Sequence, residues 1–448
     1  MLDKVLVANR GEIACRVIRA CKEAGIASVA VYSEADAGMP HAKMADEAYP
    51  IGPPPVNQSY LVQDRIIEVA REAGASGVHP GYGLLSENPG FAQRVTDEGM
   101  VWIGPPADAI RAMGIKTKAR EAMRSAGVPI VPGVTTPVTD LKDALDVAKD
   151  LGYPVMLKPV AGGGGIGMQE VETPEEMEAA FTSSSHQAGI FFSNVSVYLE
   201  KLIVGARHVE IQVLADGHGR TFHLNERECS IQRRFQKVIE EAPSCCVDDD
   251  VRAKMGAVAC TAARAISYRS AGTVEFLMAP DGSFYFLEMN TRLQVEHPIT
   301  EMTTGIDIVR EQLAIASGEP LSFTQSDVGV KGHAIEMRIY AEDPERFLPS
   351  PGTIERLVWP QGEHVRVDTG VEEGVTVTPF YDPLLAKMCV WGEDRLAAIK
   401  RGLEALEATT LEGLRSNIPL HKRVLAHPAF QVGELSTSFL EEHITPGS

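Results

Sequence analysis

Glu275, Glu288 and Asn290 are the first residues that suggest a chemistry, because two carboxylates and an amide stand in otherwise apolar surroundings. The flanking segments 273–278 and 283–290 are rich in aromatic and β-branched residues. A Pro-Asp-Gly signal, typical of a turn, separates the two segments. The sequence therefore predicts a β-hairpin that carries these three polar side chains.

The register of this hairpin decides whether the carboxylates meet. With a two- or four-residue loop, Met278 is expected opposite Ser283. Glu288 then lies opposite Thr273, diagonal to Glu275 and on the same face. A three-residue loop would instead place the two carboxylates on opposite faces. The other face of the hairpin is expected to carry Val274, Phe276, Tyr285 and Leu287.

A cation explains why two carboxylates share an apolar hairpin. Asn290 is expected on the face of Glu275 and Glu288, because strand side chains alternate with period two. Two such carboxylates repel each other and lose solvation unless a cation joins them. Oxygen ligands from one or two carboxylates, together with substrate phosphates, are what Mg²⁺ prefers. The hairpin therefore predicts a Mg²⁺ site; the alternative is a pair of exposed surface glutamates.

A run of glycines indicates a phosphate-binding loop. Gly162–Gly165 are consecutive and Gly167 stands just beyond, and such a run leaves backbone N–H groups free to approach an anion. Lys158, at the end of an apolar segment, can direct its charge at the same phosphates. No Lys-Ser or Lys-Thr pair follows, so the loop is not a Walker A motif. The alternative is a flexible hinge without a ligand.

A cation, an amide and a carboxylate follow the hairpin directly. If the chain stays extended, Arg292, Gln294 and Glu296 project to one side. A guanidinium suits bidentate capture of a small oxyanion, and a carboxylate beside it can act as a general base. The alternative is a surface salt-bridge cluster. Arg338 alternates with apolar residues in segment 333–340. Its position there is explained as well by a solvated strand face as by a role in a site.

Composition and charge exclude several classes of protein. The chain has 448 residues, of which 44% are hydrophobic and 23% charged, as in a globular protein of two or three domains. A net charge of −19 argues against a nucleic-acid partner. No apolar run approaches the ~20 residues of a membrane helix, and the first residues lack a secretory pattern. Seven cysteines without a CxxC pair are typical of a reducing cytoplasm.

The elements that must position these residues begin with strands and helices that alternate over residues 1–110. The alternation predicts an α/β fold whose N-terminal part is a Rossmann-like parallel sheet covered by helices. Asn9-Arg10-Gly11-Glu12 stands after the first strand in place of a GxGxxG motif, which argues against dinucleotide binding. The expected strands are 5–8, 28–32 and 101–103, and the expected helices are 13–24 and 61–73.

A second and a third region follow. The stretch 128–140 is rich in Pro, Thr and Gly and is typical of a linker. Beyond it, antiparallel strands are expected at 197–201, 208–214 and 220–224. From residue 333 onward the pattern predicts strands mixed with two helices, at 394–408 and 418–426.

Motifs over nearly the whole chain resemble the biotin carboxylase family of the ATP-grasp superfamily. They are Ala8–Ala14 (ANRGEIA), His79–Gly83 (HPGYG) with Ser86–Asn88, the glycine loop from Gly162, Arg207–Gln212 (RHVEIQ), Gln232–Lys237 (QRRFQK) and Glu288–Pro298 (EMNTRLQVEHP). The last of these is highly specific. The resemblance implies an N-terminal domain at 1–112, an ATP-grasp domain at 113–330 with a mobile lid near 130–203, and a mixed α+β C-terminal domain at 331–448.

The resemblance also implies a role for each candidate residue. ATP would be contacted by Lys116, Lys158, Gly163, Gly164, Gly165, His208 and Gln232, with Glu200, Lys201 and Ile203 around the adenine. Mg²⁺ or Mn²⁺ would be held by Glu275 and Glu288, with support from Asn290. Bicarbonate would be bound by Lys237, Arg292, Gln294 and the backbone of Val295, with Glu296 as base. Arg338 would stabilise the biotin enolate, and Tyr82 would lie near biotin.

The implied enzyme is an ATP-dependent ligase that makes carboxyphosphate from bicarbonate and passes the carboxyl group to biotin. Family habit implies a homodimer that works with a biotin carboxyl carrier protein and a carboxyltransferase. The sequence has no Ala-Met-Lys-Met motif, so carrier and carboxyltransferase are expected on other chains or in a longer polypeptide. Those partners would decide the final acceptor of the carboxyl group.

Three positions depart from the family pattern and keep alternatives open. Ile166 stands where many relatives carry Arg or Lys, Phe235 replaces a frequent His, and Ile115 replaces a common Asp. One alternative is another ATP-grasp ligase that makes an acylphosphate for amide formation. A second is a nucleotide-binding regulatory subunit with weakened catalysis.

Overall fold

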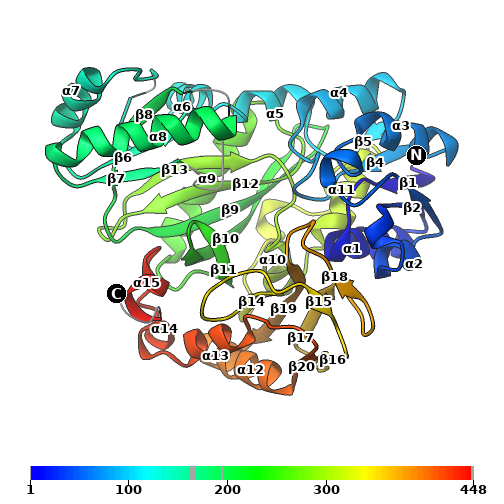
Figure 1. Ribbon diagram of the computed structural model, residues 1–448. Coiled ribbons are helices and arrows are strands. Elements are labelled where there is room, and N and C mark those ends of the chain that lie inside the picture. Colours follow the sequence, from blue (N-terminus) through cyan, green and yellow to red (C-terminus); the bar gives the residue numbers. More distant parts are fainter. Residues whose placement is uncertain (1, 135, 161–166, 193–194, 445–448) are drawn as a thin grey trace.

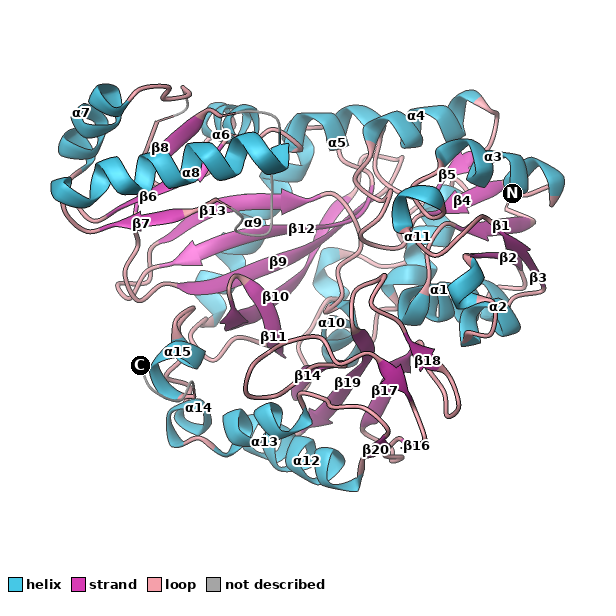
Figure 2. Cartoon of the chain, in the orientation of Figure 1, coloured by secondary structure: helices cyan, strands magenta, loops and turns pink. Residues whose placement is uncertain are grey.

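The computed structural model describes residues 2–134, 136–160, 167–192 and 195–444. These residues form an α/β structure with a five-stranded, a three-stranded and an eight-stranded sheet, accompanied by two short strand pairs (Figures 1 and 2). The short pairs join β15 (Gly352–Thr353) with β18 (Thr376–Val377) and β16 (Arg356–Val358) with β20 (Thr410–Glu412). None of the helices in the described ranges is long and apolar enough to cross a membrane.

The five-stranded sheet is parallel throughout, which confirms the prediction for the N-terminal region. Its order is β3-β2-β1-β4-β5. The strands are β1 (Lys4–Val7), β2 (Ala27–Tyr32), β3 (Glu47–Pro50), β4 (Gly77–His79) and β5 (Val101–Trp102), and the helices are α1 (Gly11–Glu23), α2 (Pro40–Met44), α3 (Gln63–Glu72) and α4 (Pro89–Asp97). Val5 and Val7 pack with α1, whereas Leu6 packs with α3 and α4, so both faces of the sheet are covered.

A small three-stranded antiparallel sheet has a core of its own. It contains β6 (Val155–Pro159), β7 (Gln169–Val171) and β8 (Val197–Lys201), in the order β7-β6-β8. Helices α7 (Leu141–Leu151) and α8 (Met177–Phe192) pack on it, at the upper left of Figure 1. Residues such as Leu157, Val171 and Leu199 form this separate apolar cluster. The described residues of segment 138–201 therefore form a compact unit beside the larger sheet.

The largest sheet has eight antiparallel strands and continues from the middle of the chain into its C-terminal part. Its order is β13-β12-β9-β10-β11-β14-β19-β17. The strands are β9 (Arg207–Ala215), β10 (Thr221–Arg233), β11 (Gln236–Ala242), β12 (Ser270–Met278), β13 (Phe284–Asn290), β14 (His333–Tyr340), β17 (Val365–Thr369) and β19 (Leu384–Gly392). The pairing of β11 with β14 joins the two parts.

Helices cover this sheet on both faces. The helices are α5 (Ala107–Met113), α6 (Lys116–Ser125), α9 (Asp249–Ala265), α10 (His297–Thr304), α11 (Ile308–Ala316), α12 (Arg395–Ala408), α13 (Ile418–Ala426), α14 (Pro428–Val432) and α15 (Phe439–His443). Val209, Ile211 and Val213 of β9 pack with α6 and α9. Because strand residues alternate, the polar residues between them project from the opposite face.

The predicted hairpin exists, but its predicted register was wrong. Met278 pairs with Phe284 instead of Ser283, and Glu288 lies directly opposite Glu275 instead of Thr273. The five-residue loop 279–283 causes the first shift, and a β-bulge at Leu287 adds one more residue to β13 between the pairs Phe276–Phe286 and Glu275–Glu288. The loop length and the bulge together also change the inner face: Phe286 and Met289, rather than Tyr285 and Leu287, pack with Val274 and Phe276.

Other expected elements differ in extent. The strand expected at 220–224 runs on to Arg233, because a register shift between His223 and Glu226 interrupts its pattern without ending it. The helices expected at 394–408 and 418–426 are α12 and α13, and the short α14 and α15 follow them. The segment 290–297 does not stay extended, which was the condition for Arg292, Gln294 and Glu296 to project to one side, since residues 295 and 296 form a turn before α10.

Candidate functional site

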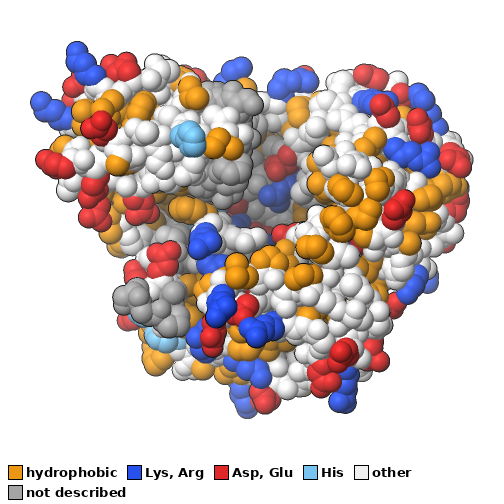
Figure 3. Space-filling model, in the orientation of Figure 1, with side chains coloured by type: hydrophobic (Ala, Val, Ile, Leu, Met, Phe, Trp, Pro, Cys, Tyr) orange, Lys and Arg blue, Asp and Glu red, His pale blue; other side chains and the backbone are white. Residues whose placement is uncertain are grey.

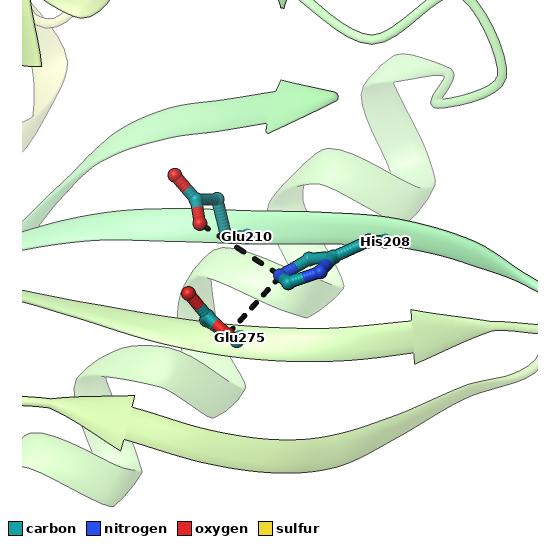
Figure 4. Close-up of side chains that lie close together, drawn as sticks. All are labelled: His208, Glu210 and Glu275. Atoms are coloured by element: carbon teal, nitrogen blue, oxygen red, sulfur yellow. Dashed lines mark ion pairs between the residues drawn. The ribbon is translucent and has the colours of Figure 1, made fainter. Parts of the chain in front are cut away.

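The polar faces of β9 and β12 meet in a buried cluster. His208 and Glu210 alternate with the apolar residues of β9, and Glu275 lies directly opposite Glu210 in the register of β12. Nε2 of His208 lies 3.2 Å from a Glu275 oxygen and 3.9 Å from a Glu210 oxygen (Figure 4). Gln232 of β10 approaches the other ring nitrogen of His208 at 2.7 Å. Four residues from three strands are thus held together.

Lys237 of β11 is the centre of this cluster. Its Nζ atom lies 2.5 Å from Glu210, 2.8 Å from Glu275 and 2.6 Å from Glu296. Burial alone would lower the pKa of Lys237, but these three carboxylates raise it well above its usual value. A bulge at Val238 turns Lys237 toward the cluster, because the β10–β11 register leaves one extra residue there. The site therefore holds a permanently charged ammonium.

Glu296 lies between two cations. One of its oxygens is 2.6 Å from Lys237, and the other is 3.0 Å from the Arg338 guanidinium. Burial would raise the pKa of Glu296, but Lys237 and Arg338 hold it well below its usual range. Arg338 of β14 also donates to Glu240 of β11 at 2.6 Å. Glu296 is therefore an ionised carboxylate whose two oxygens are both engaged by positive charge.

A fully buried arginine orients the amide of Gln294. Arg227 of β10 donates to the Gln294 side-chain oxygen at 2.7 Å and to Glu210 at 2.6 Å. With its oxygen occupied, Gln294 donates its NH₂ group to Glu275 at 2.9 Å. Asn290 donates to the same Glu275 oxygen at 2.8 Å. The hydrogen bonds therefore point both amide groups toward the central carboxylate.

Arg292 lies at the edge of the cluster. It donates to Glu87 at 3.0 Å and to the side-chain oxygen of Asn290 at 3.0 Å. Burial would lower the pKa of Arg292, but the carboxylates of Glu87 and Glu296 raise it. Glu87 belongs to the segment 86–88 of the N-terminal part, so this contact connects the parallel sheet with the hairpin.

The residues of the predicted metal site fit a hard divalent cation that also binds phosphates. The carboxylates of Glu275 and Glu288 are cross-strand neighbours on one face, and Asn290 supports Glu275 by donating its side-chain N–H to it. Glu288 is part exposed, and its ion pair is a long one, 3.4 Å to Lys116. Glu288 and Asn290 line a cavity of about 350 Å³, which leaves room for substrate oxygens beside the carboxylates. In the described part of the chain, two tighter groups of potential ligands also occur, namely His208–Glu210–Glu275 and Glu210–Cys229–Glu296.

Further candidates lie on the three-stranded sheet, away from Lys237. Lys158 of β6 and Arg120 of α6 both form ion pairs with the buried carboxylate of Glu200. Lys201 donates to the carbonyl oxygens of residues 152 and 153 at 2.8 and 2.9 Å. Ile203 lines a cavity of about 430 Å³ near residues 437 and 438. The predicted loop residues Gly163, Gly164 and Gly165, and Ile166, lie outside the described residues.

A cavity of about 450 Å³ opens beside Arg338. Its walls include Glu12, Tyr82, Arg292, Val295, Arg338 and Phe380. The face of the molecule is hollowed near its centre, where acidic and basic side chains are visible inside (Figure 3). The Tyr82 hydroxyl donates to Glu12 of α1. An apolar and aromatic rim around three guanidinium groups, those of Arg10, Arg292 and Arg338, suits a small, flat molecule that carries a polar end.

Most residues of the cluster were candidates from the sequence, but several of its members were not predicted. Glu210 could have been found, since it shares the period-two face of His208 and Gln212 within the quoted motif. Arg227, Glu240 and Arg120 carried no local signal, because their partners come from strands far away in the sequence. The individual roles assigned to the candidate residues stay predictions.

Comparisons with known proteins give a consistent result along the chain. Residues 1–110 match the family described as "Biotin carboxylase, N-terminal domain". Residues 116–324 match "Carbamoyl-phosphate synthase L chain, ATP binding domain", and residues 336–442 match "Biotin carboxylase C-terminal domain".

Full-length relatives agree with these matches. The chain is 54% identical over 444 residues to biotin carboxylase 2 of Bacillus subtilis, covering 99% of this chain and 100% of the relative. It is 50% identical over 445 residues to the biotin carboxylase of Haemophilus influenzae, covering 99% of both chains. A solved dimer of the biotin carboxylase domain of Hydrogenobacter thermophilus 2-oxoglutarate carboxylase, with MgADP, ADP and bicarbonate, superposes with a TM-score of 0.96 at 47% identity, covering 99% and 98%.

Proposed function

Because the chain belongs to the biotin carboxylase family, we propose that it carboxylates biotin with bicarbonate at the expense of ATP. The observation that carries the proposal is the position of Glu296 between Lys237 and Arg338, at 2.6 and 3.0 Å, beside the 450 Å³ cavity. A carboxylate between two cations, with an amide and a third cation nearby, is suited to bind an anion and to accept its proton.

Bicarbonate binds among Lys237, Arg292, Gln294 and the backbone of Val295, and Glu296 is the base. The N–H groups of Val295 and Glu296 donate to no acceptor within the described part of the chain, so they are free for an anion. The low pKa of Glu296 follows from its two cations. When the bound anion shares those cations, the proton affinity of Glu296 rises, and the carboxylate accepts the bicarbonate proton.

The deprotonated bicarbonate oxygen then attacks the γ-phosphorus of ATP. The bond to ADP breaks, and carboxyphosphate forms. Lys116, Lys158, His208 and Gln232 contact the nucleotide, and Glu200, Lys201 and Ile203 surround the adenine. Bound Mg²⁺, held by Glu275 and Glu288 with Asn290 in support, would neutralise charge on the phosphate oxygens. The protein therefore acts mainly by positioning and electrostatics.

Biotin occupies the cavity beside Arg338 and Tyr82. Carboxyphosphate separates into CO₂ and phosphate, and the phosphate accepts the N1′ proton of biotin. The resulting enolate attacks CO₂ with its nitrogen, which gives carboxybiotin. Arg338 stabilises the enolate charge, because its guanidinium lines the cavity while Glu240 fixes it from the sheet side at 2.6 Å.

The wider assembly follows from the family. We propose domains at 1–112, 113–330 with a lid near 130–203, and 331–448; the separate core of the three-stranded sheet supports the lid. A cytoplasmic homodimer that serves a biotin carboxyl carrier protein and a carboxyltransferase is part of the same proposal. The Hydrogenobacter relative forms a dimer, which supports the oligomeric state.

The test is transfer of isotope-labelled bicarbonate to free biotin in the presence of ATP and Mg²⁺. Label in biotin that depends on both ATP and Mg²⁺ is the expected result. ADP release that needs bicarbonate but leaves free biotin and a biotinylated carrier unlabelled would instead indicate an acylphosphate ligase. Nucleotide binding without turnover under any of these conditions would indicate a regulatory subunit.

A further inference from the structure

Lys387 is a lysine that the proposed reaction does not use, and it is fully buried. It stands in the middle of β19, directly opposite Arg338 in the β14–β19 register. Its Nζ atom donates to the carbonyl oxygen of Val295 at 2.9 Å. Lysine is almost never fully buried without a partner, because burial of an ammonium loses its solvation. Its contacts therefore need an explanation.

The contact with Val295 fixes the peptide that leads into Glu296. The Val295 carbonyl and the Glu296 N–H belong to one peptide unit, and in a trans peptide these two groups point in opposite directions. A donor that holds the carbonyl on one side therefore directs the N–H to the other side. Residues 295 and 296 form a turn rather than a strand, so no sheet ladder holds this peptide in place.

The charge of Lys387 is matched by a carboxylate from the N-terminal part of the chain. Nζ lies 3.2 Å from an oxygen of Glu12 in α1, and the other Glu12 oxygen accepts the Tyr82 hydroxyl. Burial would lower the pKa of Lys387, but Glu12 and the nearby carboxylates of Glu336 and Asp368 raise it. Lys387 is thus a charged donor held by α1, β14 and β17 against the loop after β13.

We propose that Lys387 is a positioning residue for bicarbonate binding, acting through the Val295–Glu296 peptide. Lys387 is not among the residues that line the cavity, whereas Val295 and Glu12 are, so its effect reaches the anion through the backbone. The proposal rests on the proposed function, since it names what orients the same bicarbonate site. It predicts a larger defect for bicarbonate than for ATP, because Lys387 contacts none of the residues assigned to ATP.

The experiment measures KM for bicarbonate, KM for ATP and the melting temperature in Lys387 variants. Lys387→Met keeps an unbranched side chain of similar length and removes the donor. It is expected to raise KM for bicarbonate about tenfold, the upper range for one lost hydrogen bond. KM for ATP should stay within about twofold of the wild-type value, well below that effect. Lys387→Arg retains a charged donor with different geometry and should give a rise of roughly threefold.

A double variant separates positioning from loss of stability. Lys387→Met leaves the Glu12 carboxylate buried without its cation, which destabilises the fold. The combination of Lys387→Met with Glu12→Gln removes both charges, so the melting temperature should recover while KM for bicarbonate stays raised. Lys4→Met is the matched control, because Lys4 likewise bonds a backbone carbonyl, that of Ala73 at 2.8 Å, and a glutamate. It should affect the melting temperature alone.

A wild-type KM for bicarbonate in the folded double variant would overturn the proposal, as would equal rises in both KM values. If neither methionine variant folds, Lys387→Arg decides the question by the same comparison. Failure of the proposed function has a different signature, since the wild-type protein would then transfer no label from bicarbonate to biotin.

Discussion

The base role of Glu296 predicts that Glu296→Gln stops catalysis without unfolding the protein. A positioned general base contributes about 10²–10⁴-fold to a rate. At ~1.4 kcal/mol for each factor of ten, the barrier should rise by roughly 3–5 kcal/mol. Glutamine has nearly the same shape as glutamate but cannot accept the bicarbonate proton, so the loss should appear in kcat more than in KM for ATP.

The cost in folding stability is expected to be small, because no cation loses its last partner. Lys237 keeps Glu210 at 2.5 Å and Glu275 at 2.8 Å, and Arg338 keeps Glu240 at 2.6 Å. Removing one partner of a buried pair costs about 3–5 kcal/mol when it leaves an unpaired charge. Here the cost should stay near the ~1–2 kcal/mol of an altered buried hydrogen bond.

Glu241→Gln is the matched control, since Glu241, which lies on β11, is a buried glutamate like Glu296. It pairs with Arg395 at 2.6 Å and with His333 at 2.8 Å, away from the cavity. Among the described residues, Arg395 has no second carboxylate partner, so this variant should lose more stability than Glu296→Gln while it retains the rate. The two variants should therefore show opposite effects: Glu296→Gln loses the rate and little stability, whereas Glu241→Gln loses stability and keeps the rate.

The assay is biotin-dependent ADP release at saturating bicarbonate, with urea unfolding on the same samples. A Glu296→Gln variant that keeps more than about one tenth of the wild-type rate would refute the base assignment, because the smallest expected effect is larger. A loss of activity that merely follows a loss of folded protein would refute the stability argument.

Three further predictions use other parts of the structure. Arg338→Lys should lower carboxybiotin formation by about 10²-fold or more, because a single ammonium cannot span Glu240 and the enolate, while biotin-independent ADP release falls less; equal losses in both assays would contradict it. Glu288→Gln should raise the Mg²⁺ concentration for half-maximal rate by at least about tenfold, measured by titration of free Mg²⁺, and an unchanged midpoint would remove Glu288 from the metal site. Burial lowers the pKa of His421 to about 4. Because the unfolded value is about 6.5, the neutral folded form contributes stability that is complete above pH 6.5 and is lost as the pH falls toward 4. His421→Gln should therefore flatten the pH dependence of the unfolding free energy by about 1.4 kcal/mol per pH unit in that window. Urea unfolding at several pH values measures the slope, and an unchanged slope would contradict the assignment.

Local signals made much of the fold predictable from the sequence. Helix α12 was expected from Asp394, and Asp394 does cap it, with its side chain accepting from Ala397 N–H. The parallel sheet followed from strand and helix alternation. Glu275, Glu288 and Asn290 were expected on one face, and they do share it, although the five-residue loop 279–283 and a bulge at Leu287 together give a different register from the predicted one.

The remaining features depend on the register of strands far apart in the sequence. A bulge has no fixed residue signature, so the bulges at Leu287 and Val238 could not be predicted from the sequence. These bulges turn Glu288 and Lys237 toward the cluster. Lys387 is one charged residue in an otherwise apolar strand, and its partner Val295 stands 92 residues earlier. Such contacts are decided by tertiary packing and carry no local pattern.

The continuous eight-stranded sheet has a consequence for how the molecule folds. Strands β11 and β14, which join the two parts of the chain at a seam, pair by backbone hydrogen bonds within one sheet. Each of the two strands supplies one cation to Glu296, namely Lys237 from β11 and Arg338 from β14. A shortened chain that lacked β14 and the residues after it would leave β11 as an open edge with unpaired backbone groups, a surface prone to aggregation. The strands on the two sides of the seam should therefore unfold in one cooperative transition, and fragments nicked at residues 318–332 should stay associated.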